Sequence, residues 1–149
     1  MLILVSACLL GVNCKYNGGN NKNERVMEFL KDKEFVMACP EELGELNTPR
    51  IPCEIVGLAK DILNNKDKGK VINKSGDDIT ENFLKGAYET LKIVKSNNIK
   101  KAILKAKSPS CGYGLVYDGT FSEKLTLGNG VTAQILKDNN IDVITEEDI

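Results

Sequence analysis

LILV (residues 2–5) is a short, uninterrupted apolar run that leads directly into Ser-Ala-Cys. Three further short and mainly apolar runs follow, at residues 35–38, 102–104 and 141–144, and longer stretches with helical periodicity separate them. Runs of this length are typical of strands that are buried on both faces of a parallel sheet. The alternation of strand and helix therefore predicts an α/β fold with a mainly parallel sheet flanked by helices.

Helical patterns fill the intervals between these runs. Apolar residues within 26–30 form a short stripe after an Asn-rich loop, as expected of a helix that connects two parallel strands. The strongest pattern spans residues 80–97, where apolar side chains recur at steps of three and four and Thr80 is the expected N-cap. A last helix should lie within residues 130–140. Residues 66–78 are mostly polar, and we expect a mobile excursion or a small hairpin there.

Length and composition limit the classes of protein to consider. A chain of 149 residues suits one domain, so we expect residues 1–149 to form a single unit. The 20 basic and 21 acidic residues nearly cancel, which argues against general binding to a nucleic acid or a membrane. The apolar opening lacks the charged leading segment of a secretory signal. We therefore expect a cytoplasmic protein whose five cysteines are free thiols or metal ligands, and the sequence leaves its oligomeric state open.

Three of the cysteines follow predicted strands. Cys8 comes after the first run, Cys39 after the second and Cys111 after the third. Because ligands of open α/β sheets bind beyond the carboxyl ends of the strands, these thiols can meet there without any local Cys-x-x-Cys spacing. The alternative is that each is a small buried side chain, since free cysteine is among the most buried residue types. The recurrence at three strand ends favours a shared site.

The chain contains no histidine, which excludes a Cys–His nucleophilic pair and every mixed Cys/His zinc site. Sites built from thiolates select zinc, copper(I) or iron–sulfur clusters. A site with three thiolates also leaves one metal position open for a substrate. Two other classes remain open at this stage: a zinc-binding structural or interaction module, and a cysteine-dependent sulfur-transfer protein without a cluster.

Seven short motifs occur in order along nearly the whole chain: SACLLG (6–11), YNGG (16–19), ACPE (38–41), TPR (48–50), SPSCG (108–112), VYDGTFS (116–122) and GNGVTA (128–133). Through them the sequence resembles the thiouracil desulfidase family. The resemblance implies a Rossmann-like domain with a [4Fe-4S] cluster that Cys8, Cys39 and Cys111 hold, leaving one iron without a protein ligand. It also implies a small-molecule thiolated pyrimidine as substrate, either free base or nucleotide. The implied reaction is the non-redox hydrolysis of C=S to C=O with release of hydrosulfide.

The resemblance further implies that Glu41 and Ser108 are the acid–base residues, with Glu42 and Ser110 as neighbouring alternatives. In the resulting hypothesis, Glu41 directs a water to the thiocarbonyl carbon while Ser108 positions the ring or relays a proton. Taken alone, Glu41 would be a carboxylate favoured at a helix N-terminus, and Ser108 a cap or turn residue before Pro109. Four more motif residues are expected to bind substrate or to hold the loops of its pocket: Ser6, Tyr16, Arg50 and Asp118.

Cys14 and Cys53 lie outside the three motif cysteines, and we expect them to be structural thiols. Cys14 is close enough in sequence to Cys8 to become a fourth ligand, which would close the cluster to substrate. Asn17 and Glu123 depart from the residues that are usual in the family, so the choice among thiolated pyrimidines stays open. The balanced charge makes a thiolated tRNA the least favoured of these substrates.

Overall fold

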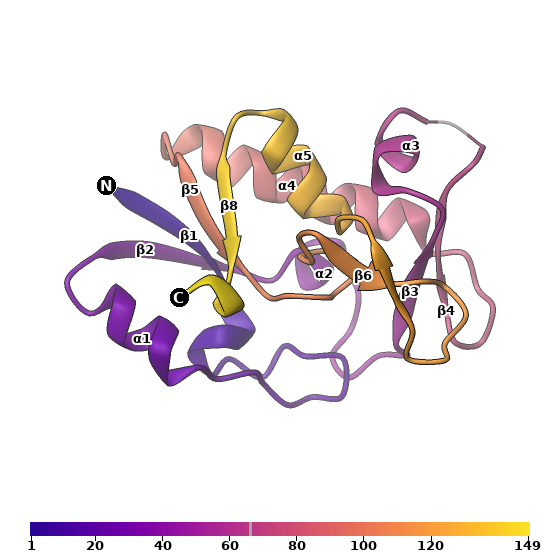
Figure 1. The fold of residues 1–149 in the computed structure, drawn as a ribbon, viewed down its shortest axis with the longest axis horizontal. Helices are drawn as coiled ribbons and strands as arrows, with labels where there is room; N and C mark the ends of the chain where they lie inside the picture. The colour runs from indigo at the N-terminus through magenta and orange to yellow at the C-terminus, as the bar shows by residue number, and fades with distance from the viewer. Residues whose placement is uncertain (66) are drawn as a thin grey trace.

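The fold is organised around four parallel strands (Figure 1). The computed structural model describes residues 1–65 and 67–149. Its main sheet has the strand order β2-β1-β5-β8, and every neighbouring pair is parallel. The strands are β1 (Leu2–Ser6), β2 (Glu34–Ala38), β5 (Lys101–Leu104) and β8 (Asp142–Thr145). All four runs that the sequence predicted as strands form this sheet, and the predicted α/β class with a mainly parallel sheet is confirmed.

Helices cover both faces of the sheet (Figure 1). On one face lie α4 (Thr80–Ser96) and α5 (Val131–Asp138), and on the other lie α1 (Glu24–Leu30) and the 3-10 helix η1 (Ala7–Leu10). Two short helices come directly after strands of the sheet: α2 (Pro40–Leu43) follows β2, and the 3-10 helix η2 (Glu146–Asp148) follows β8. Among the described residues, none of the helices is long and apolar enough to cross a membrane.

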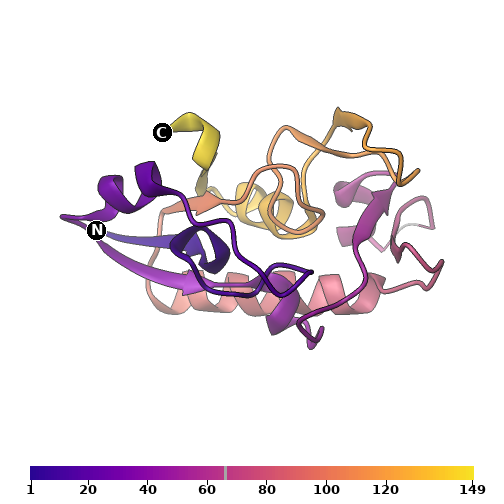
Figure 2. The same cartoon turned by 90° about the horizontal axis from the view of Figure 1, so that it is seen from below.

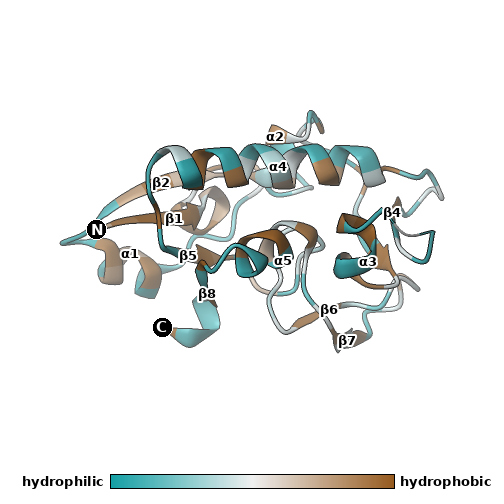
Figure 3. Ribbon diagram, turned by 90° about the horizontal axis from the view of Figure 1, so that it is seen from above, coloured by the Kyte–Doolittle hydropathy of each residue, from teal (hydrophilic) through white to brown (hydrophobic). Residues whose placement is uncertain are grey.

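The apolar run of β1 is buried from both sides. Leu4 faces the core that α4 and α5 share, while Ile3 and Val5 face a smaller core beneath α1, and all three side chains are at most 2% exposed. Successive strand residues point to opposite faces, so a strand covered on both faces needs a continuous apolar sequence. Figure 3 shows apolar and polar bands along α4. The buried residues of this helix include Phe83 and Ala87.

Two antiparallel ribbons lie at the end of the molecule away from the N-terminus (Figure 2). β3 (Cys53–Val56) pairs with β4 (Lys70–Asn73), and β6 (Leu115–Tyr117) pairs with β7 (Leu125–Leu127), while α3 (Ala59–Leu63) follows β3. The prediction of an excursion or small hairpin at 66–78 is confirmed for the turn at residues 72–78, where Ile72 forms an antiparallel bridge with Asp78. It did not include the pairing of residues 70–73 with β3. Val71 is fully buried and pairs with Ile55, so the segment is a strand of a longer-range ribbon. Residue 66 lies outside the described part of the chain.

The start of α4 also differs from the prediction. Ile79 is the N-cap and Thr80 is the first helical residue. The Thr80 hydroxyl accepts a hydrogen bond from the backbone N–H of Val71 at 2.9 Å and donates one to the carboxylate of Asp78 at 2.6 Å. This side chain therefore joins the helix to β4 instead of capping the first turn.

Candidate active site

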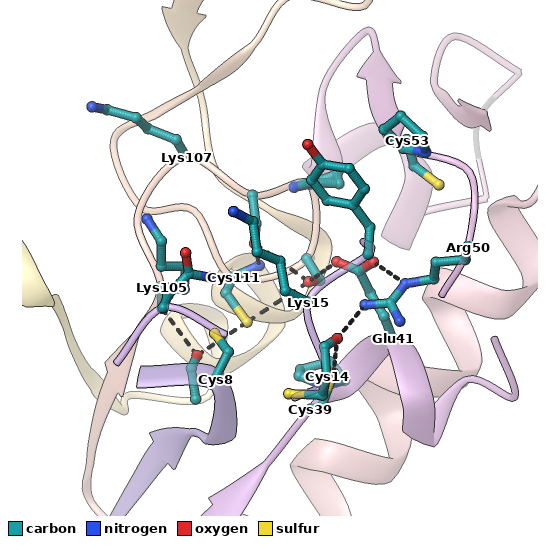
Figure 4. A pocket seen from close by; sticks show the side chains of 18 of the residues that line it. Cys8, Cys14, Lys15, Cys39, Glu41, Arg50, Cys53, Lys105, Lys107 and Cys111 are labelled. Atoms are coloured by element: carbon teal, nitrogen blue, oxygen red, sulfur yellow. Dashed lines mark hydrogen bonds and ion pairs between the residues drawn. The ribbon is translucent and has the colours of Figure 1, made fainter. Parts of the chain in front are cut away.

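A cavity of about 450 Å³ opens where the parallel strands end (Figure 4). Cys8 follows β1, Cys39 follows β2 and Cys111 follows β5 after a short loop, and all three line this cavity. The three cysteines therefore line one cavity, at the strand ends where the sequence placed them. Cys14 and Cys53 line the same cavity, so it is lined by every cysteine of the chain.

Cys8 lies in η1, immediately after β1. This turn ends at Gly11, whose φ of 91° is a conformation that glycine adopts without strain. Hydrogen bonding with the Cys14 thiol lowers the pKa of Cys8 from 9.0 to about 7, and the Asn21 side chain and the charge of Lys105 act in the same direction. This shift increases the thiolate fraction of Cys8 near neutral pH, and the thiolate is the form that binds a metal.

Cys39 is the N-cap residue of α2, and α4 holds this short helix in place. Hydrogen bonding with Cys14 and with the backbone N–H of Glu42 lowers the pKa of Cys39. The backbones of α2 and α4 are in direct contact, because a Cβ added to Gly86 would lie only 2.0 Å from the carbonyl oxygen of Pro40. Glycine is required for this approach, so the position of Cys39 depends on a small residue far away in the sequence.

Cys111 lines the same cavity and is only 4% exposed. Burial raises the pKa of its thiol to about 12, although the hydroxyls of Ser6 and Ser110 act in the opposite direction. Ser6 Oγ donates to the Cys111 sulfur at 3.3 Å and accepts from the backbone N–H of Lys105 at 2.9 Å. Ser6 thereby ties β1 to the segment after β5. A bound metal would supply the positive charge that ionises this thiol.

The N-terminus of α5 holds the loop that carries Cys111. The backbone N–H groups of Val131 and Thr132 donate to the carbonyls of Pro109 and Ser110, both at 2.9 Å. A Cβ added to Gly130 would lie 2.4 Å from the carbonyl carbon of Ser110. The GNGVTA motif therefore holds the loop that carries Cys111 through backbone contacts. Its N–H groups bond to loop carbonyls, so this helix end serves packing and not anion binding.

Glu41 lines the cavity, and its carboxylate lies between two hydrogen-bond donors. One carboxylate oxygen accepts a hydrogen bond from Arg50 Nε at 2.9 Å, and the other accepts from Ser110 Oγ at 2.9 Å. The Glu41 and Arg50 side chains are 13% and 8% exposed, so this is a nearly buried ion pair. Glu42, the neighbouring alternative, is exposed and accepts from the Thr48 hydroxyl, outside the cavity lining.

The two serines of SPSCG have different environments. Ser110 is 3% exposed and donates to Glu41, whereas Ser108 is partly exposed and accepts from the backbone N–H of Cys111 at 2.8 Å. Their hydroxyl oxygens are 3.4 Å apart. The side chains therefore form a chain from the cavity surface to the carboxylate, in the order Ser108, Ser110, Glu41.

The four residues expected at the substrate pocket have different positions. Tyr16 and Arg50 line the cavity, and Arg50 is already bound to Glu41. Ser6 lines it too, but its hydroxyl serves Cys111 and the backbone after β5. Asp118 is not among the lining residues, and its carboxylate accepts from the side chain and backbone of Thr120, which lowers its pKa. The structure places Asp118 as a residue of the β6–β7 turn.

Sequence reasoning assigned no role to several residues that line the cavity. Lys105 and Lys107 follow β5, and each forms an ion pair with the acidic η2, Lys105 with Glu146 at 2.8 Å and Lys107 with Glu147 at 3.4 Å. The β6–β7 turn adds Phe121 and Glu123, and strand β6 adds Tyr117. The position of Lys105 directly after a predicted strand could have indicated that it lines the cavity. The VYDGTFS motif could have indicated the same for Tyr117 and Phe121.

The thiols fit a cluster better than a single ion. Within the described part of the chain, no group of three Cys, Asp or Glu side chains is close enough to hold one metal ion. In an iron–sulfur cluster the thiolates bind different irons, so Cys8, Cys39 and Cys111 can line a cavity without converging on one point. A structural zinc instead needs four donors around one centre. Hydrogen bonding with Cys39 and Cys8 raises the pKa of Cys14.

Three comparisons place the chain among known proteins. The family model described as 2-thiouracil desulfurase matches residues 3–148. YbbK, an uncharacterised protein of Bacillus subtilis (strain 168), is 46% identical over 149 residues, which cover 99% of this chain and 97% of YbbK. The solved structure of the [4Fe-4S]-dependent thiouracil desulfidase TudS superimposes with a TM-score of 0.86 at 34% identity, over 99% of this chain and 91% of that one. With this agreement of sequence, fold and cavity, the chain belongs to the 2-thiouracil desulfurase family.

Proposed function

We propose that this protein is a [4Fe-4S]-dependent enzyme that converts the C=S group of a thiolated uracil to C=O by non-redox hydrolysis, with release of hydrosulfide. The observation that carries the proposal is the shared cavity of Cys8, Cys39, Cys111 and Glu41, in a fold like that of the desulfidase TudS. The match to TudS covers 99% of this chain and 91% of TudS, which supports a common activity.

Cys8, Cys39 and Cys111 are the residues that would hold the cluster, one thiolate on each of three irons. Two of these thiols already have lowered pKa values, and the third lies beside two hydroxyl donors. When bound, the cluster supplies a Lewis acid at the iron without a protein ligand, which polarises the thiocarbonyl group.

Glu41 is the base in this proposal. Arg50 and Ser110 each donate to one carboxylate oxygen, which fixes the plane of the carboxylate and leaves a lone pair on each oxygen for a water molecule. Glu41 therefore orients a water toward the thiocarbonyl carbon and takes its proton as the C–O bond forms.

Ser110 and Ser108 complete a proton path. Ser110 Oγ is 2.9 Å from Glu41 and 3.4 Å from Ser108 Oγ, and the backbone N–H of Cys111 orients Ser108. Ser110 donates to Glu41 in this structure, so its hydroxyl must turn toward Ser108 before it can accept the proton taken by Glu41 and pass its own proton to Ser108. Ser108 then donates to the substrate ring as the carbon–sulfur bond breaks. This path keeps the role expected for Ser108 and makes Ser110 the link to the carboxylate.

The substrate is a small molecule in this proposal. Tyr117 and Phe121 give the cavity aromatic groups that can stack on a pyrimidine ring. The net charge of −1 gives no general attraction to tRNA. Free bases and nucleotides with sulfur at position 2 or 4 remain the compounds to compare.

The test is anaerobic reconstitution with iron and sulfide, followed by visible spectroscopy and by the loss of thiouracil absorbance on addition of 2-thiouracil or 4-thiouracil. We expect a brown protein that releases hydrosulfide, and the cluster should be lost in Cys8→Ala. Glu41→Gln should keep the cluster and lose at least about 100-fold in turnover. A colourless, inactive protein that binds one zinc would reject the proposal. Undiminished turnover in a fully loaded Glu41→Gln protein would remove Glu41 from the mechanism.

A further inference from the structure

Glu54 is a carboxylate of the cavity to which the mechanism gives no role. It belongs to β3 and lines the cavity together with Phe121 of the β6–β7 turn. Its Oε1 accepts a hydrogen bond from the backbone N–H of Gly119 at 2.9 Å and another from the backbone N–H of Phe121 at 3.2 Å. Glu54 therefore connects β3 with a turn that lies 65 to 67 residues further along the chain.

The backbone of this turn has an unusual conformation at Phe121. Its φ is 55°, in the left-handed region that a bulky side chain rarely adopts. Such a conformation persists only where the surrounding structure holds it. The turn holds itself in part, because the Asp118 carboxylate accepts from the backbone N–H of Thr120 at 3.0 Å. The N–H of Phe121 bonds to Glu54 instead, so Glu54 acts at the residue whose backbone is strained.

The turn also lies directly against β3. In Figures 1 and 2 the β6–β7 ribbon is beside the β3–β4 ribbon, and β3 contacts β6. A Cβ added to Gly119 would lie 2.7 Å from the carbonyl oxygen of Ile55 and 3.1 Å from the Val56 side chain. Because the backbones approach this closely, the two hydrogen bonds to Glu54 fix the turn in one position against the strand.

Phe121 is the aromatic residue that this turn brings to the cavity. Its side chain is half-buried and lines the cavity. The direction of the Cα–Cβ bond follows from the backbone conformation, so a change in the φ of Phe121 would move its ring. The proposed substrate is a flat pyrimidine, and such a ring binds to a phenyl group by stacking. The position of the turn therefore decides whether the substrate meets this wall of the cavity.

We propose that Glu54 is a positioning residue that holds Phe121 as one wall of the substrate site and so sets the affinity for the pyrimidine ring. The inference rests on the proposed function. Glu54 acts through the backbone of the turn and takes part in no proton transfer. Its loss should therefore raise KM and leave kcat nearly unchanged, as expected when an interaction of similar strength in the ground state and the transition state is removed.

The test compares Glu54→Ala, which has no acceptor, with Glu54→Gln, whose amide oxygen can still accept both N–H groups. Phe121→Leu removes the aromatic ring, and the double variant Glu54→Ala/Phe121→Leu shows whether the two residues act together. Asp77→Ala is the matched control, because this carboxylate follows β4, accepts from the Asn73 side chain at 3.2 Å and is outside the cavity lining. Amide hydrogen exchange at residues 119–121 is measured in the metal-free protein. KM and kcat are measured after reconstitution, with whichever of 2-thiouracil and 4-thiouracil the unaltered protein converts.

We expect roughly tenfold faster exchange at the amides of Gly119 and Phe121 in Glu54→Ala, because a hydrogen bond to a charged group is lost at each. KM should rise roughly tenfold at unchanged iron content, and Phe121→Leu should raise it to a similar degree. The double variant should have the same KM as the single variants, since both changes remove one interaction. Glu54→Gln and Asp77→Ala should resemble the unaltered protein.

Unchanged exchange and unchanged KM in Glu54→Ala would overturn this inference and leave the proposed function intact. Increases in KM that multiply in the double variant would also overturn it, because Glu54 would then act without Phe121. A KM for Glu54→Gln as high as that of Glu54→Ala would do the same, since it would indicate direct contact of the charge with the substrate. An unchanged KM in Phe121→Leu would overturn it even if Glu54→Ala did not fold. Absence of turnover in the unaltered, loaded protein would instead reject the proposed function, and with it the substrate role of Glu54.

Discussion

Replacing Gly130 with alanine should displace the loop that carries Cys111. The φ of Gly130 is −67°, so alanine fits the backbone conformation and the effect comes from contact alone. The new Cβ would lie 2.4 Å from the Ser110 carbonyl carbon, 2.5 Å from its oxygen and 2.7 Å from the Cys111 nitrogen. Ordinary contact begins near 3.4 Å, so helix and loop must separate by about 1 Å.

That separation breaks the hydrogen bonds between α5 and the loop. Val131 N donates to Pro109 at 2.9 Å, and Thr132 N and Ala133 N donate to Ser110 at 2.9 and 3.1 Å. Lengthening these contacts by about 1 Å takes them beyond hydrogen-bond range. At roughly 1 kcal/mol each, their loss lowers the free energy of unfolding by about 2–3 kcal/mol. For a chain of this size, that corresponds to a fall in Tm of roughly 5–10 °C.

The assay is thermal unfolding of the metal-free protein together with the iron content after reconstitution. Gly128→Ala is the matched control, because a Cβ there would meet only the Val116 side chain, at 3.3 Å. Both substitutions reduce the entropy of the unfolded chain equally, so their difference isolates the contact. We expect Gly130→Ala to bind far less iron than Gly128→Ala. Equal Tm and equal iron content in the two variants would refute the conclusion that α5 positions Cys111.

Three further predictions follow from the contacts of the site. Arg50→Ala leaves the Glu41 carboxylate nearly buried without its cation, so the free energy of unfolding should fall by about 3–5 kcal/mol in urea denaturation, and an unchanged midpoint would contradict this. Ser110→Ala removes the link between Ser108 and the carboxylate, so kcat should fall about 10- to 100-fold at constant cluster content, whereas KM should hardly change. In the metal-free protein, the pKa of Cys8 is lowered to about 7 and that of Cys111 is raised to about 12. The thiolate fraction of Cys8 therefore rises as pH increases through 7, and alkylation with iodoacetamide at pH 8 should label Cys8 long before Cys111, as peptide mass spectrometry can establish. Equal labelling of Cys8 and Cys111 would contradict the lowered pKa of Cys8 and the raised pKa of Cys111.

The cysteines and the strands that carry them could be predicted because their signals are local. A strand buried on both faces needs a continuous apolar sequence, and LILV at 2–5 provides one whatever lies elsewhere in the chain. Parallel strands end at the same edge of a sheet, so Cys8 and Cys39 had to approach each other once β1 and β2 paired. The cluster and the acid–base roles of Glu41 and Ser108 were predicted only from the resemblance to the thiouracil desulfidase family.

The ribbons β3–β4 and β6–β7 could not be predicted in the same way. β4 is short, with Val71 and Ile72 set in a mostly polar segment, and Val71 is buried where the strand pairs with β3. Glu54 of β3 accepts hydrogen bonds from the backbone N–H groups of Gly119 and Phe121, which fixes the β6–β7 turn near the cavity. Glu54 is far in sequence from Gly119 and Phe121, so no periodic pattern within either segment indicates this contact.

The sequence by itself determined the parallel sheet, the shared position of three thiols and the chemistry that thiols without histidine can support, since burial pattern and residue type are properties of each segment. The tertiary structure decided which serine meets Glu41. Ser108 and Ser110 are two residues apart in one loop, and α5 selects between them by bonding to the loop carbonyls. It also decided that Cys14 lines the same cavity as Cys8 and Cys39, where Arg50, from a distant segment, donates a hydrogen bond to its carbonyl.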